Sequence, residues 1–541
     1  MKKILTYSIL TIIITACGFL DEQPQSQLEP DKVITSASSL YENTVLTLYA
    51  HIGSANQGEG LQGTYRGVYD LQTFTTNEVF IPTRGNDWYD GGLWQDLYLH
   101  TYTAHNEVVL NSWNYLFSIV SLCNNSLYLL EHYKQLLTTE EYVAYNAEVR
   151  ALRAIYYEYL LDLFARVPIV TEASVTIYDI KQAERSEVFE FVNSELAECL
   201  PHLSYEMSQQ AGKYYGHITQ PVAWFALQKL ALNSEIWTDN DWCDNIFPDG
   251  NSIIITLPYN EQKTAWEAVE YCASQIESYG FSLDLVVSDC FAVHNETSIE
   301  NIFTIPMDQN LYRNHYEEQF RSMHYQHGAA IGYGGNNGSC ATLETLEIFG
   351  YGTANKDARF QEYFFADTVR VDNQNLILSD GSVLVYAADK VKLDLTGNEY
   401  VATAGARMYK YAIDPMAMSD GKLRQNDIVL FRYADVLLMK AEAKLRMNKN
   451  ADNEYNMIRQ RSWNEQQTNV TIEDIYEERW RELAWEGWHR QDMIRFHKFT
   501  LPYSFRQQLE GEENEYGYTT VFPIPQTIID MNKNFTQNKG Y

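Results

Sequence analysis

Apolar residues recur every three or four positions over several long segments of the chain, which is the spacing of one face of an α-helix. The clearest of these segments runs from Tyr142 to Leu163. It follows Thr138 and Glu141, whose spacing predicts a capping box, the reciprocal side-chain-to-backbone pairing that opens many helices. Pro168 lies shortly after its end. The pattern therefore predicts one long helix that buries an apolar stripe.

A second capping box is predicted at Thr264 and Glu267, at the start of apolar residues spaced from Trp266 to Tyr279. Gly280 follows, where glycine commonly ends a helix because it adopts a left-handed backbone without steric cost. Further helices are predicted at 186–203, 219–237, 430–447 and 473–496, and short strands at 301–305 and 382–386. These patterns predict a mainly α fold with long irregular, aromatic-rich loop insertions and a few short strands.

The first 16 residues have the features of a secretory signal peptide. Lys2 and Lys3 supply positive charge, and residues 4–14 are apolar apart from Thr and Ser. That stretch is too short for a comfortable bilayer span. It ends in Ile-Thr-Ala-Cys, which resembles the lipobox of bacterial lipoproteins, so we predict that Cys17 becomes a lipid-modified anchor. An ordinary secreted protein with a chance cysteine is the alternative.

The net charge of −32 restricts the partners of the chain. Such a surface repels the phosphates of nucleic acid, and no cluster of Lys and Arg offsets it. The acidity leaves open a structural calcium ion between acidic loops; no other metal and no cofactor is predicted. Apolar residues make up 45% of the chain, which argues against disorder over most of its length.

Six cysteines besides Cys17 are widely spaced, without a CxxC pattern or clustered histidine partners. This spacing does not support a zinc site. A disulfide would be permitted in an oxidising compartment, but for most of them the simpler interpretation is that of small buried apolar groups. The six are Cys123, Cys199, Cys243, Cys272, Cys290 and Cys340.

The motif-like segments of the sequence do not predict a catalytic or cofactor-binding site. Residues 58–63 match GxGxxG, but no strand-like segment precedes them and no clear helix follows, so they do not predict a dinucleotide site. His324 and His327 lack a nearby acidic third ligand, which argues against a metal site. Acidic residues are numerous, so a carboxylate pair for glycoside hydrolysis stays open. We predict no catalytic residue.

Three large aromatic residues stand among glycines and acids at 86–94, without helical or strand periodicity. Aromatic rings pack on the apolar C–H faces of sugars, while carboxylates accept hydrogen bonds from hydroxyl groups. We therefore predict that Asp87, Trp88, Tyr89 and Trp94 contact a ligand, which would be a sugar or, through backbone hydrogen bonds, a peptide. The competing interpretation is that the aromatic residues fold back as the private core of a loop.

A second candidate is the turn-rich loop at 332–338, which carries one aromatic residue and two amides. We predict that Tyr333, Asn336 and Asn337 contact the ligand; the competing interpretation is a simple connector. The aromatic content of the whole chain, 14% with 40 tyrosines, is consistent with a stacking surface.

The C-terminal third closely resembles hallmark segments of the SusD/RagB-like outer-membrane lipoproteins of Bacteroidetes. These segments are DIVLFRYADVLLMKAEA at 427–443, EERWRELAWEG at 477–487 with DMIRF at 492–496, and FPIP at 522–525 through NKGY at 538–541. Segments at 146–154, 167–170 and 87–89 are similar to the family as well, so the resemblance covers essentially the whole mature chain. One departure is His489, which stands where many members have arginine and leaves the usual salt bridge missing or titratable.

The resemblance implies a scaffold of tetratricopeptide-like helix pairs, with loop insertions that form the ligand face. Family members sit as lids on a SusC-like TonB-dependent transporter and hand it glycans or, in some cases, peptides. The implied organisation is a signal peptide at 1–16, an N-terminal SusD-like region with the ligand loops at 17–300 and a C-terminal RagB/SusD region at 301–541. The Asp21-Glu22 pair is similar to the acidic signal that sends such lipoproteins to the cell surface.

The expected protein is thus a non-catalytic, oligosaccharide-binding lipoprotein on the outside of the outer membrane. A peptide-binding lid on the same scaffold is the main alternative. A surface glycosidase and a purely structural stabiliser of the transporter are the others.

Overall fold

The computed structural model describes residues 30–244, 246–512 and 517–541. The expected signal peptide, the Cys17 anchor and the Asp21-Glu22 pair lie outside these ranges. Among the helices within them, none has the length and apolar character needed to cross a membrane.

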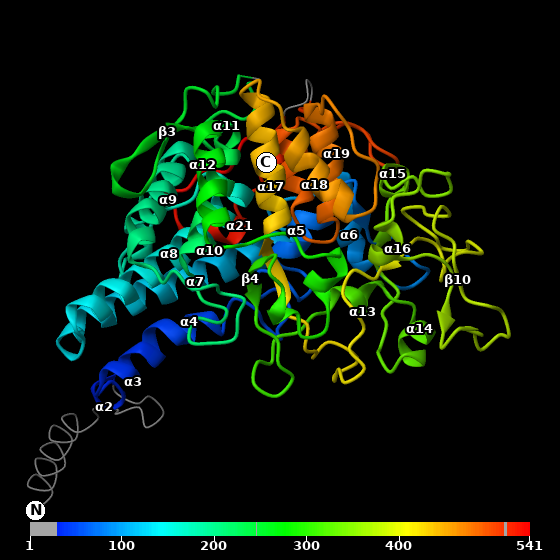
Figure 1. Ribbon diagram of the computed structural model, residues 1–541, viewed down its shortest axis with the longest axis horizontal. Coiled ribbons are helices and arrows are strands. Elements are labelled where there is room, and N and C mark those ends of the chain that lie inside the picture. The colour runs from blue at the N-terminus through cyan, green and yellow to red at the C-terminus, as the bar shows by residue number, and fades with distance from the viewer. Residues whose placement is uncertain (1–29, 245, 513–516) are drawn as a thin grey trace, which may run out of the picture.

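Long helices that pack side by side form the scaffold (Figure 1). Each of α7 to α10 packs on the next, and α12 lies between α10 and α17. The scaffold helices are α7 (Glu107–His132), α8 (Thr139–Phe164), α9 (Arg185–Cys199), α10 (Gln220–Leu232), α11 (Ser234–Trp237), α12 (Ala265–Ser278), α17 (Tyr433–Arg446), α18 (Asp452–Arg461), α19 (Ile472–Leu483) and α20 (His489–Arg495). The predicted mainly α fold of packed helix pairs is confirmed.

Both predicted capping boxes are present. The Thr138 hydroxyl accepts a hydrogen bond from the Glu141 backbone N–H, and the Glu141 carboxylate accepts one from the Thr138 N–H, so α8 begins at the next residue. Thr264 and Glu267 form the same pairing at the start of α12. Gly280, just past the end of α12, has a φ of +93°, which fits a glycine that ends a helix.

Three predicted helices are wrong in extent. The segment predicted at 219–237 is two helices, α10 and α11, with Asn233 between them. The segment predicted at 430–447 begins as strand β12 (Ile428–Arg432), and α17 starts only at Tyr433. A short, fully buried apolar run cannot be assigned to helix or strand from periodicity alone. The segment predicted at 473–496 is two helices, α19 and α20, because Trp485 and Gly487 adopt φ values of +69° and +78° that no α-helix contains.

Helix α7, which is 26 residues long, escaped the sequence patterns. Its start is defined by Asn106, whose side chain accepts hydrogen bonds from the N–H groups of Val108 and Val109. Its buried positions include polar residues such as Ser112 and Asn124, which interrupt a purely apolar stripe. The Asn124 side chain accepts a hydrogen bond from Arg153 on α8, so these polar groups serve the helix contact.

The strands are short and form two-stranded antiparallel sheets. The longest pair joins β4 (Asn301–Ile305) to β12, which confirms the predicted strand at 301–305. Of the strand predicted at 382–386, only Val385–Tyr386 (β10) is regular; it pairs with β7 (Asp367–Thr368). The other pairs are β1 (Val79–Phe80) with β5 (Cys340–Ala341), β2 (Ile254–Thr256) with β3 (Gln262–Thr264), β6 (Phe364–Phe365) with β11 (Arg407–Met408), and β8 (Arg370–Val371) with β9 (Gln374–Asn375).

Irregular segments with short helices form the other part of the molecule, which lies on the right in Figure 1 around α6, α14 and β10. One hydrophobic core runs from Ile34 to Phe535 and includes residues on both sides of position 300. Three further short helices, α2 (Pro30–Val33), α3 (Ala37–Tyr41) and α4 (Thr47–Tyr49), lie apart from this region, at the lower left of Figure 1. The remaining short helices are α5 (Val68–Thr73), α6 (Leu93–Leu99), α13 (Glu318–Ser322), α14 (Tyr325–Ala330), α15 (Leu343–Ile348), α16 (Phe360–Tyr363) and α21 (Gln526–Met531).

The family-like segments of the C-terminal third meet in a buried charge network, which we call the Glu482 cluster. It consists of Glu300, Arg359, Arg432, Arg461, Glu482 and Glu486. Arg432 lies 2.6 Å from Glu482 and 2.7 Å from Glu486, and Arg359 lies 2.8 Å from Glu482. Burial by itself raises the pKa of Glu482, but the guanidinium groups of Arg461, Arg432 and Arg359 outweigh it and hold the pKa far below its usual range. These motifs therefore fix the scaffold.

His489 makes no ion pair within the described ranges, and it is neutral. Its Nε2 lies 2.8 Å from Oδ1 of Asn77, and its ring packs on Trp480 with the centroids 4.3 Å apart. Burial, together with the nearby Arg479, lowers the His489 pKa to about 3. The expectation that the usual salt bridge is missing is therefore confirmed within the described residues. The alternative, that His489 titrates near neutral pH, is wrong.

Candidate functional site

A cavity of about 530 Å³ opens between the irregular segments near α6 and α14. Four parts of the chain form it: the loop before α5, the loop that leads into α6, the first turn of α14, and the loop at 332–338. Its lining residues are Gln57, Tyr65, Arg66, Asp87, Trp88, Asp90, Trp94, Tyr325 and Asn336. Aromatic, acidic and amide residues from separate parts of the chain thus line the same cavity.

Trp88 is a half-buried wall of this cavity. Its backbone has a φ of +63°, a conformation that bulky residues rarely adopt, so the surrounding structure must impose it. The indole N–H donates a hydrogen bond of 2.8 Å to the carbonyl oxygen of Asn336. Gly338 lies against the indole, because a Cβ at that position would be only 2.6 Å from Cε2 of Trp88. The ring is therefore fixed before any ligand arrives.

A buried ion pair lies directly behind the aromatic wall. Arg321 on α13 donates hydrogen bonds of 2.8 and 3.0 Å to the two carboxylate oxygens of Asp70 on α5. Its guanidinium carbon is 4.6 Å from the ring centroid of Tyr65 and 6.0 Å from that of Trp94, distances typical of cation–π contacts. Asp70 also accepts the backbone N–H of Arg66 at 2.6 Å. This pair holds three lining residues in place.

The two acidic groups of the cavity each use one oxygen inside the wall. Oδ2 of Asp87 accepts the Tyr325 hydroxyl at 2.6 Å. Oδ2 of Asp90 accepts both the Trp94 indole N–H at 2.8 Å and the Arg66 guanidinium at 3.0 Å. Burial and the negative charge of Asp87 raise the pKa of Tyr325 to about 12. The hydroxyl therefore keeps its proton near neutral pH and donates a hydrogen bond to Asp87.

The residues predicted from the sequence are not all at this cavity. Asp87, Trp88 and Asn336 line it, and so does Trp94, although Trp94 is only 1% exposed and its indole serves mainly as packing. Tyr89 is 58% exposed but is not among the lining residues.

Tyr333 and Asn337 are buried. The Tyr333 hydroxyl donates to the carbonyl of Asp414 at 3.0 Å, and its ring fills the space beside Gly421. The loop at 332–338 therefore contributes Asn336 to the cavity and packs its other two predicted residues into the interior. We omit Tyr333 and Asn337 from the candidate site.

Five lining residues escaped the sequence reasoning: Gln57, Tyr65, Arg66, Asp90 and Tyr325. A signal was available for the first three. They flank the glycine-rich stretch at 58–63, whose three motif glycines all have positive φ and shape a tight loop. The stretch does not predict a dinucleotide site, but its glycines shape a loop that places these three residues at the cavity.

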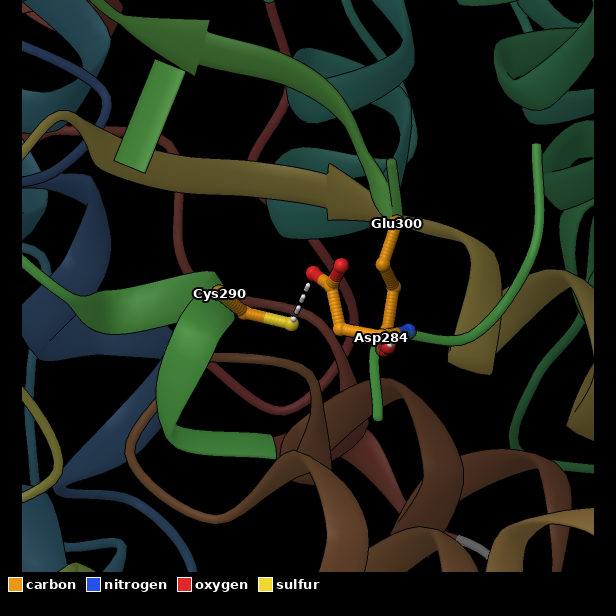
Figure 2. Close-up of side chains that lie close together, drawn as sticks. All are labelled: Asp284, Cys290 and Glu300. Atoms are coloured by element: carbon orange, nitrogen blue, oxygen red, sulfur yellow. Dashed lines mark hydrogen bonds between the residues drawn. The ribbon is translucent and has the colours of Figure 1, made fainter. Parts of the chain in front are cut away.

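One group of side chains has metal-ligand types at close range: Asp284, Cys290 and Glu300 (Figure 2). Their ligand atoms lie within 4.8 Å of one another, and the Cys290 thiol donates to Asp284 at 3.5 Å. However, Glu300 is already paired with Arg432 at 2.8 Å and Arg461 at 2.5 Å. Burial raises the pKa of the Cys290 thiol well above its usual value, whereas a metal requires the thiolate. We assign no metal to this group.

The predicted histidine and cysteine roles follow the simpler interpretations. His324 and His327 are buried beside Tyr386. The Tyr386 hydroxyl accepts a hydrogen bond of 3.0 Å from the backbone N–H of His324 and lies 3.0 Å from Nδ1 of the His327 ring. Burial lowers the pKa of both histidines to about 4. Each cysteine in the described part of the chain is free, and all but Cys243 are buried.

Two family models match the chain. Residues 18–232 match the family described as "Starch-binding associating with outer membrane", and residues 299–541 match the SusD family. The chain belongs to the SusD/RagB-like family.

Known SusD proteins resemble the chain over nearly its whole length. The starch-binding protein SusD of Bacteroides thetaiotaomicron is 22% identical, covering 90% of this chain and 87% of the relative. A SusD-like protein of Bacteroides ovatus is also 22% identical, covering 92% and 83%. Among solved structures, surface glycan-binding protein A from Bacteroides thetaiotaomicron in complex with laminarihexaose has a TM-score of 0.69 at 18% identity, covering 93% of this chain and 100% of that one. The first of these relatives and the solved structure are named as binding proteins, and the solved structure shares the fold.

Proposed function

We propose that this SusD-family protein binds oligosaccharides in the cavity beside Trp88 and delivers them to a TonB-dependent outer-membrane transporter without catalysing a reaction. The observation that carries the proposal is the fixed indole of Trp88 in a cavity whose carboxylates each keep one oxygen outside the internal hydrogen bonds. The lipid anchor at Cys17, exposure to the exterior and the transporter partner are parts of the same proposal.

The geometry suits a sugar for physical reasons. The apolar C–H face of a pyranose packs on an aromatic ring, and its hydroxyl groups donate to carboxylate and amide oxygens. The cavity, at about 530 Å³, falls in the usual range for small-ligand sites, about 300–1,000 Å³. Because the wall is held from behind by Arg321 and Asp70, binding costs little ordering of the protein.

The names of the relatives support the ligand class. One is named as a starch-binding protein, and a structural neighbour is described as bound to laminarihexaose. Both ligands are glucose polymers, which is consistent with a site built for sugar rings.

The arrangement of carboxyl groups supports a binding role over hydrolysis. A glycosidase needs a carboxylic acid of raised pKa beside the scissile bond. Burial is the main cause that raises the pKa of Glu78 to about 8 and that of Glu318 to about 7, but both side chains lie in the interior and neither lines the cavity. Glu318 instead accepts the backbone N–H of Gly63 at 2.8 Å.

Calorimetric titration of residues 18–541 with neutral oligosaccharides and with mixed peptides tests the proposal. A micromolar dissociation constant for a glycan, about −8 kcal/mol, would support it. Trp88→Ala should weaken that binding about 30-fold, or about 2 kcal/mol, as for an aromatic anchor. Tyr89→Ala is the matched control, because Tyr89 is the neighbouring aromatic residue outside the cavity lining, and it should change the affinity little.

Other outcomes would redirect the proposal. Binding of peptides alone would favour the peptide-binding lid. New reducing ends after incubation with polysaccharides would show a glycosidase. Equal affinities of the wild type and Trp88→Ala would remove the site assignment even if a glycan bound.

A further inference from the structure

Three hydrogen-bond donors of the cavity wall are already engaged inside the protein. The indole N–H groups of Trp88 and Trp94 donate to the Asn336 carbonyl and to Asp90. The hydroxyl of Tyr325 donates to Asp87. A ligand that enters the cavity thus meets the rings of these residues but not their donor hydrogens.

Arg66, the cation that lines the cavity, is also occupied. Its two terminal nitrogens lie 3.0 Å from Asp90 and 3.0 Å from Glu107, so its charge is shared between two carboxylates. The Arg66 side chain is 26% exposed and lies across the wall. An anionic ligand would have to share this charge with both carboxylates.

Two further arginines lie behind Trp88, but their hydrogens point elsewhere. Arg84 donates to the carbonyls of Val401 and Ala404 at 3.0 and 2.9 Å, and both Arg84 and Arg407 donate to the carbonyl of Gly338 at 3.3 Å. Arg84 is 5% exposed and Arg407 is fully buried. They contribute positive potential to the wall, yet they offer no donor to the cavity.

The acceptors, in contrast, stay available. Asp87 and Asp90 are exposed, and within the described ranges the hydrogen bonds to each carboxylate end on Oδ2, so Oδ1 of each is open to a ligand. The other polar groups of the lining are neutral: the amides of Gln57 and Asn336, which can donate as well as accept, and the hydroxyl of Tyr65. The free donors of the wall are therefore neutral groups, whereas its free acceptors include two carboxylate oxygens.

We infer that the cavity selects uncharged glycans, whose hydroxyl groups donate to Asp87 and Asp90, and rejects glycans that carry carboxylate or sulfate groups. A uronate or sulfate placed here would face the carboxylates of Asp87 and Asp90, while the one cation among the lining residues, Arg66, already shares its charge between Asp90 and Glu107. Such an arrangement costs affinity by like-charge repulsion and by desolvation. This inference rests on the proposed function, since it assigns a ligand class to the same cavity.

Three pairs of ligands, each a neutral oligosaccharide and its oxidised form, test the inference. The probes are laminarihexaose, maltohexaose and β-1,4-mannohexaose, each compared by calorimetry with its own C6-oxidised form, in which the primary alcohol has become a carboxylate. The uronate form should bind at least about tenfold more weakly than its parent. Raising the salt concentration should narrow the gap, because exposed charges are screened.

Asp87→Asn sharpens the test. It keeps the shape of the side chain, removes one negative charge and replaces one acceptor by an amide donor. The variant should bind the oxidised probe more tightly than the wild type does and thus reduce the ratio of the two dissociation constants. Asp372→Asn, an exposed position outside the cavity, is the matched control and should leave that ratio unchanged.

The outcomes separate the two claims. If a neutral probe and its uronate bind equally, or the uronate binds more tightly, the inference is overturned while the proposed glycan function stands. If no probe of either kind binds, the proposed function itself is overturned, and the inference falls with it.

Discussion

Two regions of this protein combine arginines with carboxylates, and they are built in opposite ways. In the Glu482 cluster every charged side chain is buried, and each arginine meets at least one carboxylate within 3 Å. In the cavity wall, Asp87 and Asp90 are exposed and each commits only one oxygen to the protein. The first region is complete without a ligand, whereas the second leaves bonding capacity for one.

Fold and ligand binding are encoded in different parts of this chain. The segments that resemble the SusD family most strongly, at 427–443 and 477–487, supply Arg432, Glu482 and Glu486, half of the buried Glu482 cluster. The cavity is formed instead by loops from four separate parts of the chain, and of the family-like segments only 87–89 reaches it. A close resemblance in the scaffold therefore says little about which ligand fits the loops.

The largest effect should come from disrupting the Glu482 cluster. Glu482→Gln keeps the shape of the side chain but leaves Arg432, Arg461 and Arg359 short of a counter-charge in the interior. Breaking a buried ion pair costs about 3–5 kcal/mol, so the free energy of unfolding in urea should fall by about that amount. A loss below about 1 kcal/mol would contradict the view that this cluster locks the scaffold.

Arg321→Met tests whether the two regions are as separate as the comparison suggests. Arg321 is buried like the Glu482 cluster but lies behind the cavity wall. The variant leaves Asp70 without its partner, so we expect a loss of about 3 kcal/mol in stability together with weaker glycan binding. Urea denaturation and calorimetry on the same sample measure both. Lost stability with unchanged affinity would show that the wall does not depend on this pair.

Protonation of His489 should make the free energy of unfolding depend on pH, without a direct effect on the cavity. Its folded pKa of about 3 lies below its unfolded value of about 6.5, so the stability that its neutral form provides is complete above pH 6.5 and declines as the pH falls toward 3. Between pH 7 and pH 5 this group alone should cost about 2 kcal/mol of stability. His489→Gln keeps a donor for Asn77 and should show a smaller loss over that interval. An identical pH dependence in both proteins would argue against this assignment.

Gly338→Ala should affect the cavity with little effect on the scaffold. The added methyl group would lie 2.6 Å from the Trp88 indole, so the ring must shift from the position that the hydrogen bond to Asn336 now fixes. We expect about tenfold weaker glycan binding, or about 1.4 kcal/mol, with a smaller change in stability. Calorimetry and thermal denaturation give the two values. An unchanged affinity would show that the orientation of Trp88 is unimportant.

The scaffold could be predicted from the sequence because its signals are local. Capping boxes at Thr138 and Thr264 and apolar residues at helical spacing define helices without knowledge of the rest of the chain. The prediction failed where tertiary structure overrides that pattern, as at the break near Trp485 and at strand β12. Helix α7 was missed because its buried face contains polar residues that bond to neighbouring helices.

The candidate site could be predicted only in part. Asp87 and Trp88 stood out because large aromatic and acidic residues clustered on one loop. Tyr325 did not, because its position at the cavity depends on a contact across 238 positions, the hydrogen bond to Asp87. Tyr65, which packs near Trp88 with the ring centroids 6.0 Å apart, lies on another loop beside the glycine-rich stretch. Tyr333 looked equally suitable in sequence, but it packs inward against Gly421.

The central claim is that a glycan binds against Trp88 in the cavity formed by the loops. The most direct measurement is a crystal structure of residues 18–541 soaked with the neutral hexasaccharide that binds most tightly in solution. We expect a sugar ring stacked on the Trp88 indole, with hydroxyl groups within hydrogen-bond distance of Asp87 and Asp90. A well-ordered sugar bound elsewhere on the molecule, with this cavity empty, would contradict it.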